Sequence, residues 1–442
     1  MKRKIIEQLL EWKLKINRKP LILKGARQVG KTYILKEFAQ KHFVRCHYFN
    51  FERSPRLCEY FEENLDPKHI LESLSFHQNQ QIDSKHDLII FDEIQACPRA
   101  LTSLKYFYEE MPEVYICCAG SLLGVYLGPV SYPVGKVDHL NMFPMTFYEF
   151  LIASENTMLV ELLDTLTLKS TIPTSAHEKL WELLKHYFIT GGLPEAVQLY
   201  CDNKDNLFTA FSKVREKQLD LIEDYFADIA KHSGKINAMH INRLLRNIPE
   251  QLGESQDGSA KKYRFKKAIP GIDRFSKLQD AIDWLDSAGL ILKTHIVNKS
   301  AQPLKAYVTE NTFKLYLFDV GILGALSDLE SKTLLSYDYG SFKGFYAENF
   351  VAQEFKAHDF SNLFCWKEKT SEVEFLQPVK NTLIPIEVKS GWTTRSKSLW
   401  IYAEKYKPPY RVIMSAKPFQ IDSENKIQRL PLYLAGFFPL DE

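Results

Sequence analysis

The residues best placed to do chemistry form a glycine-bearing stretch between an apolar run and an expected helix. The stretch fits the pattern G-x-x-x-x-G-K-[ST] and consists of Gly25, Ala26, Arg27, Gln28, Val29, Gly30, Lys31 and Thr32. Glycines let backbone amides turn toward phosphate oxygens, and a helix start adds partial positive charge. We therefore expect a triphosphate here, with Lys31 reaching its β and γ phosphates and the Thr32 hydroxyl ligating Mg²⁺. The alternative is a plain glycine turn, which the agreement of motif and context disfavours.

Two adjacent acids close a second apolar run, residues 88–91. Asp92 ends this run, and a carboxylate at the carboxyl end of a buried strand is placed to hold Mg²⁺ through water. Glu93 follows at once, where it would polarise the attacking water. The pair favours hydrolysis over binding alone. The alternative is that Asp92 caps the next helix and Glu93 is solvated.

A third position near this site is Ser121, which ends the run 114–120. Its hydroxyl could sense the γ-phosphate or the water, or it could cap the helix that follows, and the sequence leaves both open. The expected nucleotide is ATP, because no guanine-reading NKxD motif occurs and residues 203–206 read Asn-Lys-Asp-Asn.

A second set of acids lies near the C-terminus. Glu348 falls on an expected helix, Glu374 on a strand over 373–376, and Glu387 and Lys389 on a strand over 383–389. Residues i and i+2 of a strand share a face, so Glu387 and Lys389 point the same way. Three carboxylates could hold a metal ion while the lysine orients water at a phosphodiester. This set predicts a metal site of Glu348, Glu374 and Glu387, with Lys389 as the catalytic lysine.

The elements that must position these residues alternate between strand and helix at the start, which predicts parallel units of an α/β fold. The other expected elements are strands over 21–23, 48–51, 88–91, 114–118 and 290–297, helices over 31–42, 178–231, 275–288 and 346–358, and a polar loop over 254–262. Residues 261–267 carry five basic and two aromatic residues. They are either a nucleic-acid patch or the solvated face of an edge strand.

Composition bounds the class of protein. The 442 residues carry a formal charge of only +2, so a nucleic-acid contact needs a local patch. Seven scattered cysteines without CxxC spacing indicate a reducing compartment. No run approaches the length of a membrane helix. We expect a cytoplasmic protein that does not associate with membranes.

Several stretches together resemble a prokaryotic AAA-type ATPase family of the additional-strand P-loop class. They are GARQVGKT, IIFDEIQACP, AGSLLG, PMTFYEFL, GGLPEAV, FKLYLFDVGILGAL and IPIEVKSG, and the resemblance covers nearly the whole chain. It implies a parallel-sheet ATPase domain over 1–200 and a helical lid with a winged-helix-like unit over 201–330. It also implies a C-terminal α/β domain over 331–442, of unknown function, whose acids resemble the PD-(D/E)xK nuclease fold.

The chain departs from this family at two points. Gly135-Lys136 stands where a glycine-arginine pair is usual, which puts an arginine finger there in doubt because lysine lacks the planar fork. Glu372-Val373-Glu374-Phe375 stands where EVDF is usual, so Glu374 replaces an aspartate ligand. Three alternatives remain for the C-terminal module. It is an active nuclease, or an inactive relative that binds DNA or another domain, or its acid and lysine pattern arises by chance from the composition.

Three functions follow from these observations. The first is ATP hydrolysis coupled to a nucleic acid, with DNA as a possible partner. The second is a regulatory switch in which the ATP state controls a protein partner. The third is a scaffold with negligible turnover, against which Glu93 argues. The resemblance also implies that a neighbouring subunit can complete such sites, so oligomerisation is possible.

Overall fold

The computed structural model describes residues 1–120, 132–233, 235–253, 260–337, 340, 342–358, 360, 362–392 and 396–441. The chain forms two compact units. The first, called the N-terminal unit, comprises Lys2–Phe143 and Ser287–Gly289. The second, called the C-terminal unit, comprises Met1, Pro144–Asp286 and Leu290–Glu442. The division into domains over 1–200, 201–330 and 331–442 stays a prediction.

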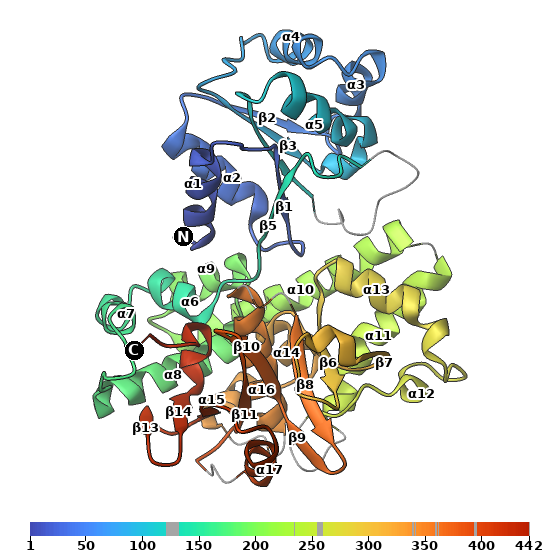
Figure 1. Ribbon diagram of the computed structural model, residues 1–442. Coiled ribbons are helices and arrows are strands. Elements are labelled where there is room, and N and C mark those ends of the chain that lie inside the picture. The colour runs from blue at the N-terminus through green and yellow to red at the C-terminus, as the bar shows by residue number, and fades with distance from the viewer. Residues whose placement is uncertain are drawn as a thin grey trace. The chain divides into compact units, whose positions relative to one another are not determined.

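The N-terminal unit is built on a five-stranded sheet with the order β2-β3-β4-β1-β5, in which every pair of neighbours is parallel (Figure 1). Its strands are β1 (Leu21–Lys24), β2 (Cys46–Asn50), β3 (Leu88–Asp92), β4 (Tyr115–Ala119) and β5 (Asp138–Asn141). Strand β4 lies between β1 and β3, so the predicted additional strand is present. The four predicted strands and the parallel α/β fold are confirmed. Strand β5 was not predicted, because its short polar sequence shows no apolar run.

Helices cover this sheet. They are α1 (Ile5–Leu14), α2 (Lys31–His42), α3 (Glu59–Glu63), α4 (Pro67–Gln78) and α5 (Pro98–Glu110), with short 3₁₀ turns at Pro55–Cys58 and Ile94–Ala96. Side chains of β2 and β3, among them Phe49 and Phe91, form one apolar cluster with residues of α3, α4 and α5. Helix α2 is amphipathic, and its Ile34, Leu35 and Phe38 are buried. The predicted helix over 31–42 is therefore confirmed with the same ends.

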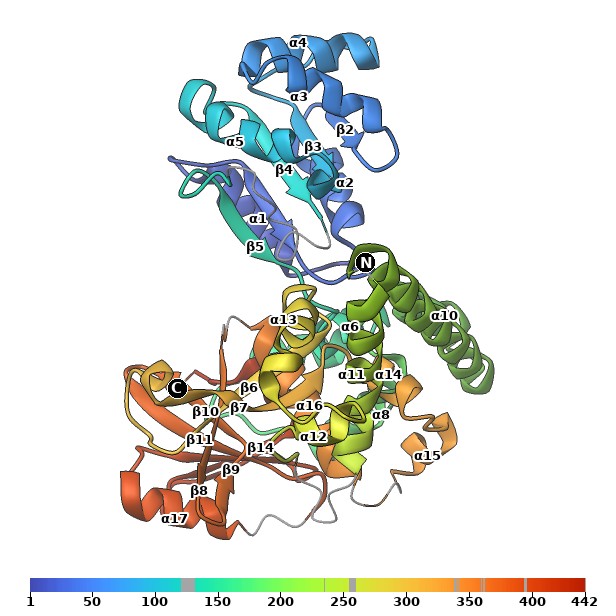
Figure 2. The ribbon, with the colours of Figure 1, turned by 90° about the vertical axis from the view of Figure 1, so that its right-hand side faces the viewer.

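The C-terminal unit begins with helices and continues with two sheets. Its helices are α6 (Phe147–Ala153), α7 (Thr157–Asp164), α8 (Thr174–Thr190), α9 (Pro194–Asn203), α10 (Leu207–Ser233), α11 (Lys235–Gly253), α12 (Phe265–Ala268), α13 (Gln279–Ser287), α14 (Val320–Leu326), α15 (Ser331–Ser336), α16 (Phe342–Ala357) and α17 (Lys397–Tyr406). Helices α10 and α11 pack against each other (Figure 2). Helices α8, α9 and α10 confirm the helical pattern over 178–231.

One sheet of the C-terminal unit has the order β7-β6-β8-β9 and the other the order β10-β11-β12-β14-β13. The strands are β6 (Ile291–Val297), β7 (Val308–Leu317), β8 (Leu363–Glu368), β9 (Ser371–Val373), β10 (Phe375–Val379), β11 (Thr382–Val388), β12 (Arg411–Ser415), β13 (Gln420–Asp422) and β14 (Ile427–Pro431). Strands β6 and β7 form an antiparallel pair after α13. This order of a helix and a strand pair is compatible with the winged-helix-like expectation, which stays a prediction.

Helix α16 is the central helix of the C-terminal unit. Eleven consecutive residues from Phe345 to Phe355 are buried, four of them polar or charged. These polar groups bond to neighbouring elements, and Asn349 bonds both backbone groups of the last residue of β7 at 2.8 Å. Gln353 donates to the Tyr187 hydroxyl of α8 at 2.7 Å, and Glu354 accepts from the first residue of α6 at 2.9 Å. Burial without these partners would cost free energy, so they fix the helix in one position.

Two family-like stretches, GGLPEAV and FKLYLFDVGILGAL, meet in this unit. The Asp319 carboxylate is fully buried and accepts from the backbone N–H groups of Gly192 at 2.6 Å and Ile322 at 3.0 Å. A Cβ atom at Gly191 would lie 2.2 Å from Oδ1 of Asp319. Glycine is needed there because the carboxylate lies against the backbone. Both stretches therefore have a packing role.

The segment over 261–267 is not an edge strand. It runs as irregular chain from Lys261 to Arg264 and then enters the short helix α12. The expected helix over 275–288 is confirmed as a 3₁₀ turn, Phe275–Lys277, followed by α13, and the strand expected over 290–297 is β6. Among the described helices, none combines the length and apolar content that crossing a bilayer requires.

Candidate nucleotide-binding site

The loop between β1 and α2 has the backbone conformation that its glycines predict. Gly25 and Gly30 have φ angles of 149° and 96°, and Gln28 also has a positive φ of 65°. A Cβ atom at Gly25 would lie 2.1 Å from the carbonyl oxygen of Met142, which follows β5. The loop is therefore pressed against the end of β5, and only glycine fits at its first position.

Lys31 opens helix α2 and lies inside the curve of this loop. Its ammonium group donates to the carbonyl oxygens of Gly25 and Ala26, each at 2.8 Å. Burial lowers the pKa of Lys31 to about 8, and the nearby carboxylates of Glu93 and Asp92 oppose that shift. A cation held in a dry loop next to backbone amides and a helix start is suited to a phosphate group.

Thr32 and Asp92 come together although 60 positions separate them. The Thr32 hydroxyl, in the first turn of α2, donates to Oδ2 of Asp92 at 3.0 Å. Asp92 is the last residue of β3 and is buried. The hydroxyl and carboxylate oxygens that meet here are hard ligands of the kind Mg²⁺ prefers. The loop and the acid pair thus lie on the same side of the sheet, as the motif interpretation requires.

Two residues of β2 complete the surroundings of Asp92, and the sequence did not single them out. The Tyr48 hydroxyl donates to Oδ2 of Asp92 at 2.6 Å, and the Asn50 amide lies 3.2 Å from that hydroxyl. Burial, together with the bond to Asp92, raises the pKa of Tyr48 to about 12. The Lys36 ammonium lies 3.6 Å from the centre of the Tyr48 ring. The available signal was the alternation in β2, which places Tyr48 and Asn50 on one face.

Glu93 follows Asp92 with a left-handed backbone conformation, φ 49° and ψ 45°. This turn directs the chain away from β3 into a 3₁₀ turn. The Gln95 amide donates to Oε2 of Glu93 at 2.5 Å. Ser121 lies outside the described residues. Lys136, at the position where the family resemblance suggests arginine, forms a salt bridge with Glu109 at 3.1 Å.

The predicted C-terminal acids are only partly brought together. Because β10 and β11 are antiparallel with Phe375 opposite Ile386, Glu374 lies opposite Glu387. Lys389 forms a salt bridge with Glu387 at 2.6 Å. Burial raises the pKa of Glu374, and the carboxylate of Glu387 raises it further.

Glu348 has hydrogen-bond partners of its own, and its charge also helps to raise the pKa of Glu374. Its Oε2 accepts from the Tyr316 hydroxyl at 2.6 Å and lies 3.4 Å from the ammonium of Lys314, while Oε1 accepts from the backbone of Ala260 at 3.2 Å. Lys314 also lies 2.6 Å from Glu372. Within the described ranges, no group of three or more His, Cys, Asp and Glu side chains is arranged to hold a metal ion. The metal set of Glu348, Glu374 and Glu387 stays a prediction.

Comparison with protein families agrees with the geometry of the loop. Residues 17–151 match the family described as AAA domain. This part of the chain is therefore similar to AAA domains. The match includes the loop, Asp92 and Glu93, and all five strands of the sheet.

Beyond the AAA domain, residues 181–333 match a domain of unknown function (DUF8612) and residues 343–434 match another (DUF4143). No curated protein matches the sequence.

Solved structures resemble the chain at low identity. A Walker-type ATPase of Pyrococcus abyssi is 15% identical, with 74% of this chain and 95% of that chain covered and a TM-score of 0.45. The ORC1 protein of Aeropyrum pernix in complex with DNA is 12% identical, with 74% and 91% covered and a TM-score of 0.30. RuvB of Thermotoga maritima is 16% identical, with 66% and 88% covered and a TM-score of 0.31.

Proposed function

We propose that this protein hydrolyses ATP with Mg²⁺ and couples the reaction to a nucleic acid. The observation that carries the first half is the 3.0 Å hydrogen bond between Thr32 and Asp92 at the mouth of the glycine loop. This bond places a hydroxyl and a carboxylate where they would share one cation beside the phosphates. The AAA-type match over 17–151 supports ATP as the nucleotide.

Each residue of the site has one task in this proposal. The backbone amides of residues 25–32 and the Lys31 ammonium bind the β and γ phosphates. Thr32 and Asp92 would hold Mg²⁺, which neutralises phosphate charge when bound. Tyr48 holds the Asp92 carboxylate in place through its 2.6 Å hydrogen bond. Glu93 accepts a proton from the attacking water, and Gln95 orients Glu93.

The second half of the proposal concerns the C-terminal unit, where a winged-helix-like part and a nuclease-like module would contact DNA. Support comes from the order α16, β8, β9, β10, β11, α17 and β12, with the acid-x-lysine pair Glu387 and Lys389 on β11 and just after it. Strands β11 and β12 are parallel and joined through α17. Cytoplasmic location belongs to the same proposal.

A second candidate is a regulatory switch whose nuclease-like module is inactive and serves as a protein-interaction platform. Lys314 favours this candidate, because its ammonium lies 3.4 Å from Glu348, where it neutralises one of the predicted metal ligands. Metal-dependent cleavage of DNA or RNA that disappears in Lys389→Ala would reject this second candidate.

The test measures ATP turnover and ATP affinity in the full chain. We expect Lys31→Ala to lose both, and Glu93→Gln to lose turnover by about 100-fold or more while it still binds ATP. The matched control is Lys41→Ala, because Lys41 lies on the same helix but is exposed and paired with Glu37. Wild-type protein that folds and shows no affinity for adenine nucleotides would overturn the proposal.

A further inference from the structure

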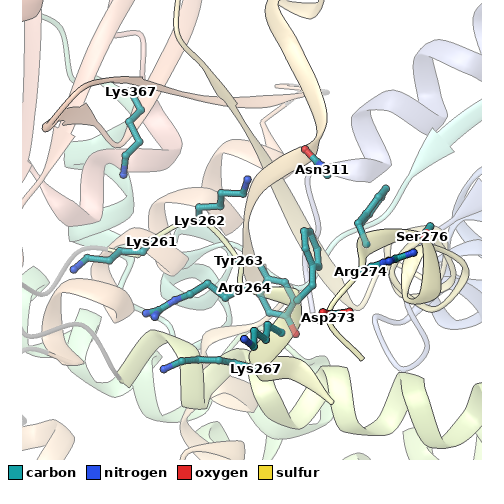
Figure 3. Close-up of a pocket in the computed structure, with 13 residues that line it drawn as sticks. Lys261, Lys262, Tyr263, Arg264, Lys267, Asp273, Arg274, Ser276, Asn311 and Lys367 are labelled. Atoms are coloured by element: carbon teal, nitrogen blue, oxygen red, sulfur yellow. The ribbon is translucent and has the colours of Figure 1, made fainter. Parts of the chain in front are cut away.

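A pocket of about 1060 Å³ in the C-terminal unit is lined mainly by cations. Its basic residues are Lys261, Lys262, Arg264, Lys266, Lys267, Arg274 and Lys367, and Asp273 is its one carboxylate among the described residues. Figure 3 shows Lys261, Arg264 and Lys267 extending toward one side of the pocket, with Lys367 approaching from strand β8. The whole chain carries a formal charge of only +2, so this concentration of positive charge is a local feature.

The basic segment is held in place by its neighbours. The backbone N–H of Tyr263 donates to Phe313 in β7 at 2.9 Å, and the Tyr263 hydroxyl donates to Asn247 in α11 at 3.1 Å. Arg264 is fixed through its backbone, which exchanges two hydrogen bonds of 2.9 Å with the Gln251 side chain. The pocket wall is therefore preorganised, which lowers the entropic cost of binding.

Aromatic packing explains why the cations face outward. Tyr263 is buried and Phe265 is half-buried, and the Phe265 ring centre lies 5.2 Å from that of Phe275 and 5.7 Å from that of Phe313. The residues between and beside these two aromatics, Lys262, Arg264 and Lys266, are exposed. Buried aromatic residues alternate with exposed basic residues, so the basic side chains form a charged surface whose backbone is held by the packed aromatic rings.

We propose that this pocket binds the sugar–phosphate backbone of a nucleic acid without reading its sequence. The proposal rests on the proposed function, because it assigns the site at which that nucleic acid is held. Five of the seven cations are lysines, which act as point charges toward phosphates in many orientations. The cations also come from three segments, so they can follow a chain of regularly spaced phosphates.

The test measures binding of a labelled single strand and a labelled duplex, each of about 30 nucleotides, to the full chain between about 50 and 200 mM KCl. The pocket variant is Lys261→Glu/Arg264→Glu/Lys267→Glu. The matched control is Lys169→Glu/Lys332→Glu/Lys407→Glu, which changes the charge equally at exposed lysines of the same unit. We expect the pocket variant to bind at least about tenfold more weakly and with a flatter salt dependence, and the control to lose about twofold or less.

Other outcomes are equally decisive. Equal losses of binding in the two triple variants would overturn the pocket assignment, and so would wild-type protein that binds no nucleic acid. The assignment would also be overturned if polyglutamate binding depended on the pocket residues while nucleic-acid binding did not depend on them. If the charge reversals disturb folding by circular dichroism, Lys261→Gln/Lys266→Gln takes their place, with at least about threefold weaker binding expected. ATP turnover without nucleic acid should be unchanged in the pocket variants. Failure of the pocket thus leaves turnover intact, whereas failure of the ATPase proposal leaves pocket-dependent binding intact.

Discussion

The ammonium group of Lys314 lies 2.6 Å from Oε1 of Glu372, and the Lys314 side chain is fully buried. The same ammonium lies 3.4 Å from Glu348. Lys314 belongs to β7, Glu372 to β9 and Glu348 to α16, so one cation joins three elements that are distant in sequence. The arrangement places a permanent positive charge among acids at a position where the sequence predicts a metal ligand.

The first prediction concerns this buried lysine. Lys314→Met removes the cation beside Glu348 and leaves Glu372 with Lys367 alone, and we expect it to lower the free energy of unfolding by about 3–5 kcal/mol. Lys314→Met/Glu348→Gln should recover part of that loss, because it removes one of the uncompensated charges. Urea unfolding of the single and double variants measures both effects. The control Lys332→Met, at an exposed lysine, should change the free energy of unfolding by less than about 0.5 kcal/mol. A change as small as this in Lys314→Met would show that the buried contacts of Lys314 with Glu348 and Glu372 do not stabilise the fold.

The second prediction concerns Tyr48. Tyr48→Phe removes the hydroxyl that donates to Asp92, and we expect it to weaken Mg²⁺-dependent ATP binding by about 5–10-fold, equivalent to roughly 1–1.5 kcal/mol. Binding measured in EDTA should change little, because Tyr48 acts through Asp92. Titration of a fluorescent ATP analogue with and without Mg²⁺ separates the two cases. Tyr33→Phe, on the exposed face of α2, is the control, and equal effects from both variants would show that Tyr48 has no special role.

The third prediction compares two glycines with positive φ. Gly25→Ala places a Cβ atom 2.1 Å from the Met142 carbonyl oxygen, whereas Gly135→Ala at φ 72° meets no atom within 4 Å. We expect Gly25→Ala to abolish ATP binding and to destabilise the fold by several kcal/mol, and Gly135→Ala to cost only about 1–2 kcal/mol of strain. Thermal unfolding and ATP titration check both. A Gly25→Ala protein that binds ATP normally would contradict the close contact between the loop and the end of β5.

The fourth prediction is a pH dependence of stability. Burial raises the pKa of Asp319 to about 6, although backbone N–H donors oppose the shift. Between its unfolded pKa near 4 and the folded value, the folded state keeps a proton that the unfolded state loses, so stability falls as pH rises through that window. The loss is about 3 kcal/mol and is complete above about pH 6.

Asp319→Asn isolates this contribution, because asparagine does not titrate. Urea unfolding from about pH 4 to 7 should give a shallower decline for the variant than for wild type, whatever its overall stability. Parallel stability curves for the two proteins would show that Asp319 does not titrate in that window.

Local motifs predicted the loop and the strands of the AAA domain, because each depends on residues adjacent in the chain. Tyr48 was missed for a different reason. The alternation in β2 assigns it to a face of the sheet, but which residue lies opposite depends on the register between β2 and β3. The polar strand β5 had no pattern to reveal it, since it is recognised only by its pairing with β1.

The C-terminal unit was harder to predict for the same physical reason. Glu348 has the residue type and position of a metal ligand, yet its partners Lys314 and Tyr316 come from a strand more than thirty residues earlier. The basic segment was expected as a patch or an edge strand. Phe265 instead packs against Phe275 and Phe313, and Tyr263 packs against Phe265, where the chain enters α12. Side-chain docking of this kind is a tertiary effect that a linear pattern does not encode.

The two sequence families beyond the AAA domain share one interior. Strand β6, from the stretch 181–333, pairs in parallel with β8, from the stretch 343–434, and α16 bonds both to the last residue of β7 and to Tyr187. Cutting the gene at that boundary would expose sheet edges and leave buried polar groups without hydrogen-bond partners on both fragments. We expect neither fragment to be recovered as an autonomous folding module, and evolutionary exchange of one half for an unrelated one to be blocked for the same reason.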